Sequence, residues 1–151
     1  MSIVAFRLVE VESFPRPLDA GVLYFSKRFN AAAHACACGC GREVITPLSP
    51  VQWRLTQGAG GASLRPSIGN WNFPCRSHYW ITGGRVEWDA DMSDEKIKAG
   101  RAFNAKLRAR YFEEQNAKEQ PQAMPLQAVS KAQEPKRGLL DRMLEWFSRL
   151  S

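Results

Sequence analysis

The sequence predicts an α+β protein, in which a small, mainly antiparallel β domain that binds zinc precedes a helix, a linker and a short amphipathic helix. Three observations support this prediction. Short apolar segments bounded by Gly and Pro fill residues 1–92, as is typical of a β-rich domain. All four cysteines and both histidines lie between His34 and His78. Helical periodicity begins only at Ser93.

The β domain is expected to span residues 1–92 and to begin with two apolar strands. Residues 3–11 are rich in Ile, Val, Phe and Leu and predict a buried strand. Pro15 and Pro17 then indicate a turn before a second strand at residues 21–26. Residues 31–41, AAAHACACGCG, are dense in small side chains. We expect this segment to be a loop wrapped around a bound group.

Further short strands are expected after this loop. Pro47 and Pro50 separate the first two of them, and Pro66 should end the third. The pair Gly83-Gly84 supplies the positive φ angles of a two-residue hairpin turn. The expected strands are at residues 43–48, 51–56 and 62–65, with a hairpin at 79–88.

The segment at residues 93–119 predicts an amphipathic helix. Ser93 is a suitable N-cap, and acidic residues follow it in the first turn, where the helix dipole favours them. An apolar stripe then recurs at spacings of three and four. Its members are Gly100, Phe103, Leu107 and Tyr111. The opposite face is basic, and we interpret it as a solvated surface.

The last part of the chain predicts a tethered helix. Residues 120–136 are rich in Pro, Gln and Ala and indicate a linker. Residues 137–151 have an apolar side that includes Trp146 and Phe147. We expect this helix to dock on a protein partner or on the domain itself. Asp141 and Glu145 weaken a membrane-surface alternative.

Composition and charge exclude several classes of protein. The chain has 151 residues, of which 44% are hydrophobic and 24% charged, so it is neither disordered nor collagen-like. Its net charge of +6 is a small excess, and no base-reading motif supports a specific nucleic-acid partner. Neither a transmembrane segment nor a signal peptide is expected. The expected location is the cytoplasm.

The metal-ligand residue types form the strongest motif. Cys36-x-Cys38-Gly-Cys40-Gly is followed by Cys75-x-x-His78, and zinc prefers four tetrahedral thiolate and imidazole ligands. Cytoplasmic thiols stay reduced, so clustered cysteines there indicate a metal site rather than disulfides. Five residues compete for four positions, and His34 would be a sixth. The sequence leaves open which residue is surplus.

The sequence also leaves open whether the zinc is structural or catalytic. A catalytic zinc keeps one position for water and needs a general base nearby. Glu43 is the nearest following carboxylate, although its position alone favours a solvated acid at a strand edge. Ser67 and Ser77 can donate hydrogen bonds to a polarised carbonyl, although turn capping is the commoner role of such serines. No other cofactor is indicated.

Two other kinds of chemistry are weakly indicated. Pro74-Cys75-x-x-His78 resembles half of a zinc-deaminase motif, but the required upstream Glu is replaced by Cys36. Thiol nucleophilic catalysis is disfavoured because a metal would take the thiolate first. The aromatic residues near the metal motif predict a small core, with a peptide-binding groove as the alternative. They are Trp53, Trp71, Phe73, Tyr79, Trp80 and Trp88.

Four segments together resemble a small bacterial Cys/His family. They are HACACGCG at residues 34–41, PSIGNW at 66–71, CRSHYWI at 75–81 and GRVEW at 84–88. Members of that family, a family of unknown function, are often encoded beside ubiquitin-like proteins and their E1-like and E2-like conjugation enzymes. The resemblance implies a zinc peptidase of a ubiquitin-like system, active in defence against phage. It assigns the metal to Cys36, Cys38, Cys40, Cys75 and His78, and it includes Ser67.

Two hypotheses for function follow. In the first, the protein is a zinc metallopeptidase or isopeptidase that processes or removes a ubiquitin-like modifier, with Glu43 as the base. In the second, the zinc is only structural and the protein is an adaptor that binds a conjugation-pathway protein. The expected partners are a ubiquitin-like protein, its E1-like or E2-like enzymes, or both.

Overall fold

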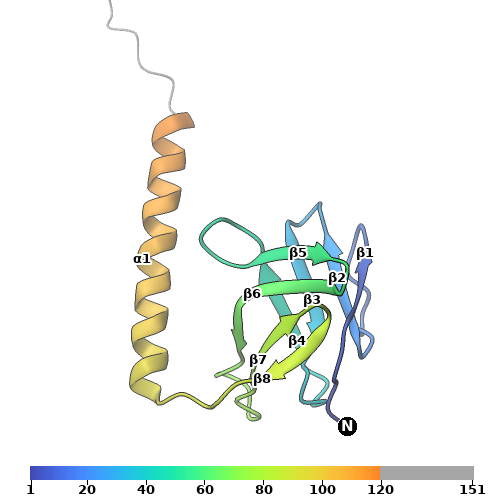
Figure 1. Cartoon of the computed structure of the whole chain (residues 1–151). Coiled ribbons are helices and arrows are strands. Elements are labelled where there is room, and N and C mark those ends of the chain that lie inside the picture. The colour runs from blue at the N-terminus through green and yellow to red at the C-terminus, as the bar shows by residue number, and fades with distance from the viewer. Residues whose placement is uncertain (120–151) are drawn as a thin grey trace, which may run out of the picture. The chain divides into compact units, whose positions relative to one another are not determined.

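The computed structural model describes residues 1–119, which form eight strands and one helix in this part of the chain (Figure 1). The predicted α+β class is confirmed. The predicted linker at 120–136 and terminal helix at 137–151 lie outside the described residues. The elements are β1 (Arg7–Glu10), β2 (Val22–Ser26), β3 (Ala31–Ala35), β4 (Glu43–Pro47), β5 (Arg54–Gly58), β6 (Gly61–Gly69), β7 (His78–Thr82), β8 (Arg85–Trp88) and α1 (Asp94–Glu119).

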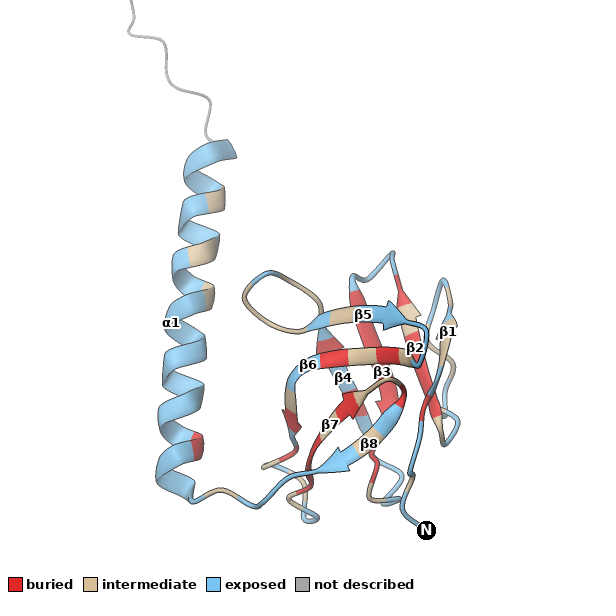
Figure 2. Ribbon diagram, viewed as in Figure 1, coloured by how far each residue is buried: buried red, intermediate tan, exposed pale blue. Residues whose placement is uncertain are grey.

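The strands form two four-stranded sheets, ordered β1-β2-β3-β4 and β5-β6-β7-β8. All neighbouring strands are antiparallel except β1 and β2, which are parallel. The N-terminal segment joins the sheets, since Phe6 N–H donates to the Gly84 carbonyl and Val86 N–H to that of Val4. Side chains of both sheets share one core, in which Leu23, Leu64 and Ile81 are fully buried. Figure 2 shows the buried residues concentrated on β2, β3, β6 and β7.

Two local predictions were wrong. Residues 31–35 are not a loop but strand β3, and every one of its residues is buried. Alanine has a low strand preference, but its small side chain lets the strand pack closely on both sides. Pro66 does not end its strand either, because β6 continues to Gly69. The register against β7 shifts between Leu64 and Ile68, and such irregular positions tolerate a proline that cannot donate to the ladder.

The helix α1 begins as predicted but buries little of its surface. Ser93 acts as the N-cap, because its Oγ accepts a hydrogen bond from Lys96 N–H at 3.4 Å. Among the described residues of α1 only Ile97 is buried, while Phe103 and Leu107 of the predicted apolar stripe are exposed. No stretch of this helix is apolar enough over the length that crossing a membrane requires. Its first turns contact the β domain, as described below.

Candidate functional site

Four cysteine thiols from two separate segments meet at one end of the β domain. Cys36, Cys38 and Cys40 lie on the loop after β3, and Cys75 lies in the turn before β7. All four Sγ atoms lie within 4.8 Å of one another. Gly39 and Gly41 have positive φ angles, 83° and 74°, which let the loop curl around the thiols. The four thiols therefore form a group that can hold a metal ion.

Polar side chains surround the most buried of these thiols. Ser77 Oγ lies 3.1 Å from Cys36 Sγ, and Asn70 Nδ2 donates to the same sulfur at 3.5 Å. Asn70 also donates to Ser77 Oγ at 2.9 Å, so the two side chains hold each other in place. Hydrogen bonds of this kind orient metal ligands and stabilise their charge.

The thiols differ in how easily they lose their protons. Burial raises the pKa of Cys75, but hydrogen bonds, first from Ser77 and then from Cys38 and Cys36, outweigh burial and bring that pKa down to about 7. Burial and then a hydrogen bond with Cys40 raise the pKa of Cys38 to about 12. The low value at Cys75 favours thiolate formation there. Thiolate is the form that binds a metal.

Neither histidine belongs to the thiol group, so the predicted five-residue ligand set is reduced to the four cysteines. His34 is fully buried in the core, and its Nε2 lies 2.8 Å from Tyr79 Oη. Burial lowers the pKa of His34 to about 3, so this imidazole stays neutral. His78 is the first residue of β7, and its ring contacts different residues altogether.

His78 pairs with Ser67. The Nε2 atom of His78 lies 3.0 Å from Ser67 Oγ, and its Nδ1 atom lies 2.7 Å from the Ala90 carbonyl oxygen. A carbonyl can only accept a hydrogen bond, so Nδ1 carries the ring proton and donates it. The neutral ring then presents the lone pair of Nε2 to the Ser67 hydroxyl. This is the tautomer that a general base for Ser67 requires.

A carboxylate lies beside this pair. Asp89 Oδ2 is 3.7 Å from His78 Nε2 and accepts a hydrogen bond from the Trp80 indole at 3.1 Å. Hydrogen bonds from Ala90 N–H and Trp80 hold the pKa of Asp89 below its ordinary value. Asp89 therefore remains ionised near neutral pH and favours a positive charge on His78 when one forms. From the sequence, Asp89 was a carboxylate that follows the hairpin, and neither it nor Ala90 was assigned a role in a site.

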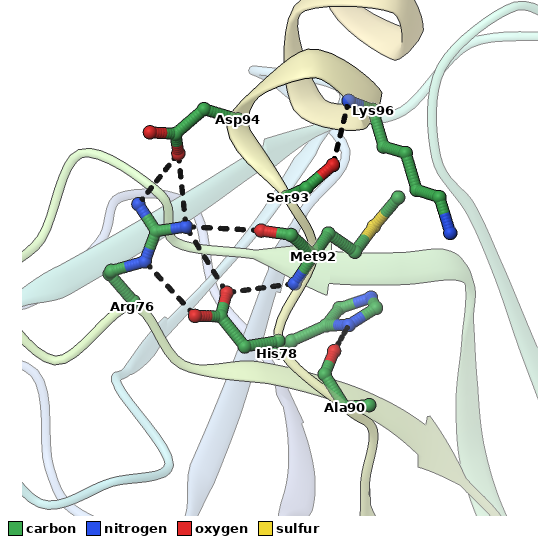
Figure 3. A network of polar contacts seen from close by, with 8 residues as sticks. Arg76, His78, Ala90, Met92, Ser93, Asp94 and Lys96 are labelled. Atoms are coloured by element: carbon green, nitrogen blue, oxygen red, sulfur yellow. Dashed lines mark hydrogen bonds and ion pairs between the residues drawn. The ribbon is translucent and has the colours of Figure 1, made fainter.

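Arg76 fixes the segment that orients His78. Its guanidinium donates to Asp91, to the Met92 carbonyl and to Asp94 at the start of α1, each at 3.1–3.2 Å. Figure 3 shows these contacts beside the hydrogen bond between His78 and Ala90. The Arg76 contacts tie together the end of the β domain and the first turn of α1.

A tryptophan covers one side of the imidazole. The ring centroids of Trp71 and His78 are 4.9 Å apart. Gly69, which pairs with His78 across β6 and β7, makes room for this arrangement, because an added Cβ there would overlap the Trp71 indole. The glycine and the tryptophan of the PSIGNW segment therefore shape the environment of His78.

The Ser67–His78 pair opens into a cleft of about 420 Å³ between the β domain and α1. Trp53, Pro66 and Trp71 line it from the β domain. Residues of α1 line the other side. His78 is only 8% exposed, so a substrate in this cleft would meet the pair in a largely desolvated place.

Glu43, the predicted base, lies elsewhere. It is exposed at the start of β4, where it pairs with Ala35, and it does not line the cleft. Ser67 is near the expected position but in a different setting, since its partner is an imidazole and not a metal. The sequence did contain a signal for this pair, because the resemblance to the bacterial Cys/His family included both the Pro-Ser-Ile element with Ser67 and the Cys-x-Ser-His element with His78.

A serine hydroxyl beside an oriented neutral imidazole is the arrangement that serine hydrolases use for acyl transfer. A comparison with protein families agrees with this class. The model of BubE, the bacterial ubiquitination-like system serine protease, matches residues 10–89, more than half of the chain. The chain belongs to this family. No curated protein and no solved structure gave a match.

The family corrects the predicted activity. A protease of a ubiquitination-like system was expected, but the zinc metallopeptidase mechanism was wrong, because the family is one of serine proteases. The physical reason lies in His78. The histidine that sequence spacing assigned to the metal faces Ser67 instead. The four thiols form a separate group, and a metal held by all four would have no position left for catalytic water.

Proposed function

We propose that this chain is a serine protease in which Ser67 is the nucleophile and His78 is the general base. The observation that carries this proposal is the 3.0 Å contact between Ser67 Oγ and His78 Nε2, with the Nδ1 proton held by the Ala90 carbonyl. The cleft in front of the pair supplies room for a peptide.

The reaction runs in two half-reactions. Ser67 Oγ attacks the scissile carbonyl carbon while its proton passes to His78 Nε2, and His78 then protonates the leaving amine as the C–N bond breaks. Water next attacks the acyl-serine ester, giving its proton to His78, and the carboxylic product leaves as Ser67 recovers its hydrogen. Asp89 stabilises the imidazolium through charge, and Ala90 keeps the ring in position.

The proposed substrate is a ubiquitin-like modifier, cleaved at its tail or at the isopeptide bond that joins it to a target. The family description places the protease in a ubiquitination-like system. Its partners would be that modifier and its E1-like or E2-like enzymes. All four cysteines are free thiols, which fits a reducing compartment, and we place the reaction in the cytoplasm.

A fluorophosphonate probe tests the nucleophile directly, since it esterifies activated serines. We expect one adduct by intact mass, assigned to Ser67 by peptide mapping. Ser67→Ala should give none. Ser49→Ala is the matched control, because Ser49 Oγ contacts Gln52 and lies outside the cleft, and this variant should label like the wild type. A folded protein without an adduct on Ser67 would overturn the proposal.

A cleavage assay tests the substrate. The protein would be mixed with a tail-extended ubiquitin-like protein encoded in the same operon, and the products weighed by mass spectrometry. We expect a cut at one defined bond that Ser67→Ala abolishes. Labelling of Ser67 without any cut would keep the serine chemistry and reject this substrate.

We further propose that the four thiols bind zinc with a structural role. Four cysteine ligands match its tetrahedral, thiolate-rich structural sites and leave no open position. The ion would cross-link the loop after β3 to the turn before β7. Metal analysis of protein purified without chelator should give one zinc per chain, and Cys75→Ser should lower that content. A different metal, or none, would contradict the assignment.

A further inference from the structure

The cleft in front of Ser67 and His78 is positively charged. Three cations, Lys96, Arg101 and Arg108, line it from α1, and no Asp or Glu is among the residues that line it. Asp89, the nearest carboxylate to His78, lies outside this lining. A cleft with charge of one sign attracts a ligand of the opposite sign.

These cations differ from other arginines nearby, which are already neutralised. Arg76 pairs with Asp91 and Asp94, and Arg110 pairs with Glu114 one turn further along α1. Within residues 1–119, by contrast, no salt bridge involves the three cleft cations. The Arg101 guanidinium donates a hydrogen bond to the neutral amide oxygen of Asn72, at 2.8 Å. Their charge is therefore available to a ligand.

The lining residues of α1 form a continuous stripe. Lys96, Gly100, Asn104 and Arg108 follow each other at intervals of four residues, which puts them on one face of the helix. This face extends for roughly 18 Å at 1.5 Å per residue. An extended peptide of about five or six residues covers the same length. The cleft thus matches a stretch of substrate chain rather than a single side chain.

Gly100 keeps the middle of this stripe open. Nothing lies within 4 Å of a Cβ added at Gly100, and its backbone is helical. Neither a close neighbour nor an unusual φ angle therefore requires glycine here. Glycine inside a helix is nevertheless less stable than alanine. Its use is explained if a peptide backbone crosses α1 at this position.

The opposite wall is apolar, made by Trp53, Pro66 and Trp71. An extended peptide points alternate side chains to opposite sides. One set would then contact the aromatic wall and the other the cations of α1. We propose, on the basis of the proposed protease function, that the cleft selects an extended substrate segment with acidic side chains next to the scissile bond.

A pair of charge-matched variants tests this inference. Lys96→Gln with Arg108→Gln removes two cleft cations and leaves the Arg101–Asn72 contact in place. Lys106→Gln with Lys118→Gln removes the same charge from α1 outside the cleft. The cleavage specificity of each full-length protein would be read from a peptide library by mass spectrometry.

We expect Asp and Glu to be enriched beside the cleaved bonds in the wild type and in the control pair. The Lys96/Arg108 variant should lose this enrichment. For this variant, kcat/KM for an acidic peptide, measured relative to the same peptide with Gln and Asn in place of Glu and Asp, should fall by about tenfold at low salt. The loss should appear in KM rather than kcat. Added salt should shrink the preference of the wild type, because these charges are screened over about 10 Å at 0.1 M.

Binding to an inactive protein separates this inference from the proposed catalysis. Ser67→Ala would be titrated against fluorescent hexaglutamate and hexaglutamine by anisotropy. We expect Ser67→Ala to bind hexaglutamate more tightly than hexaglutamine. The Lys96/Arg108 substitutions should abolish this preference, and the control substitutions should leave it in place. That result supports the inference whether or not Ser67 is the nucleophile. If both pairs of substitutions weakened the preference for hexaglutamate equally, the preference would come from the overall charge of α1, and the inference would be overturned. Fluorophosphonate labelling, which reports the nucleophile, should be unchanged in the control pair.

Gly100 gives an independent check of the path. Gly100→Leu should slow peptide cleavage while the small fluorophosphonate probe still labels Ser67. Gly100→Ala should raise the unfolding midpoint and keep most cleavage. Full cleavage by Gly100→Leu would show that substrate does not cross α1 here and would overturn the proposed path.

Discussion

The thiol group and the Ser67–His78 pair share one stretch of chain, residues 75–78, yet they are chemically separate. Ser77 and His78 are consecutive at the start of β7. Ser77 contacts the thiols of Cys36 and Cys75, whereas His78 contacts Ser67 on the other side. Successive residues of an extended chain point to opposite faces. The neighbouring residues Ser77 and His78 therefore belong to different sites, the thiol group and the Ser67–His78 pair.

The two regions also differ in how they meet solvent. The thiol group consists of four thiols that lie within 4.8 Å of one another, and Ser77 and Asn70 form hydrogen bonds with Cys36. The Ser67–His78 pair opens into a cleft of about 420 Å³. The first arrangement suits structural cross-linking and the second suits turnover of a substrate. Substitutions should therefore separate stability from activity.

The largest separation is expected at His78. His78→Gln removes the base from Ser67, and loss of the base histidine of a serine protease lowers kcat by about 10⁶-fold. Metal content should not change, since His78 lies outside the thiol group. Peptide cleavage and metal analysis on the same preparation measure both effects.

The control for His78→Gln is Ser77→Ala, which acts on the other face of the strand. It should weaken metal affinity by roughly 10–100-fold, as loss of a hydrogen bond to a ligand does, with a smaller effect on cleavage. If His78→Gln lost its metal, the thiol group and the Ser67–His78 pair would not be independent sites.

The next largest effect is on stability and comes from metal removal. If zinc holds the two cysteine segments together, chelation should lower the free energy of unfolding. The decrease should be about 4 kcal/mol compared with protein in free zinc at about a thousand times its Kd. Cys75→Ser should reproduce much of this loss. Denaturant unfolding with and without chelator measures it. Identical unfolding curves would mean that the thiol group is not a structural metal site.

The sequence predicted the thiol group better than the catalytic pair, for a physical reason. Bunched cysteines must lie close together because short chain segments confine them. The partner of His78 depends instead on which face of a strand it occupies. Cys75 and His78 share a side in a tight turn but can face opposite ways in extended chain, and Arg76 between them has a φ of 43°. Spacing alone does not distinguish these cases.

The fold shows the same limit. Alternating and apolar segments predicted most strands, and Gly83-Gly84 predicted the hairpin between β7 and β8, because those preferences are local. Strand β3 was missed because its four alanines and His34 carry little strand preference of their own. Their burial comes from the neighbouring strands and from the other sheet, and that is tertiary information. The same holds for α1, whose apolar stripe does not cover the domain.

A smaller effect is expected at Arg76, which is linked to both regions through its neighbours. Its side chain is 38% exposed and its carboxylate partners more so, so solvent screening keeps the contribution of these ion pairs to stability small. Arg76→Gln should nevertheless lower kcat by about tenfold, because the segment that carries the Ala90 carbonyl would loosen and misalign His78.

Arg110→Gln is the matched control for Arg76→Gln, since it breaks an exposed ion pair with Glu114 away from His78. It should leave cleavage unchanged. Equal kinetic effects of the two substitutions would mean that the Arg76 contacts do not position the imidazole. A rise in KM with unchanged kcat would instead mean that Arg76 contacts the substrate.

The smallest expected effect concerns His34, whose buried imidazole differs from that of His78. His34 is 0% exposed, its Nδ1 has no partner among the described residues, and burial lowers its pKa to about 3 from an ordinary 6.5. Between these values the unfolded chain binds a proton that the folded protein does not. Stability is therefore retained above pH 6.5 and falls as the pH falls toward 3, by about 0.7 kcal/mol between pH 7 and pH 6 from this residue alone.

Comparison with a His34→Gln variant isolates this contribution, because the other titrating groups are common to both proteins. Gln keeps a polar atom near Tyr79 Oη and does not titrate, so its unfolding free energy should depend less on pH in this window. Denaturant unfolding at several pH values gives the two slopes. Equal slopes would mean that His34 is protonated inside the fold, and a charged imidazole would then need a partner in the core.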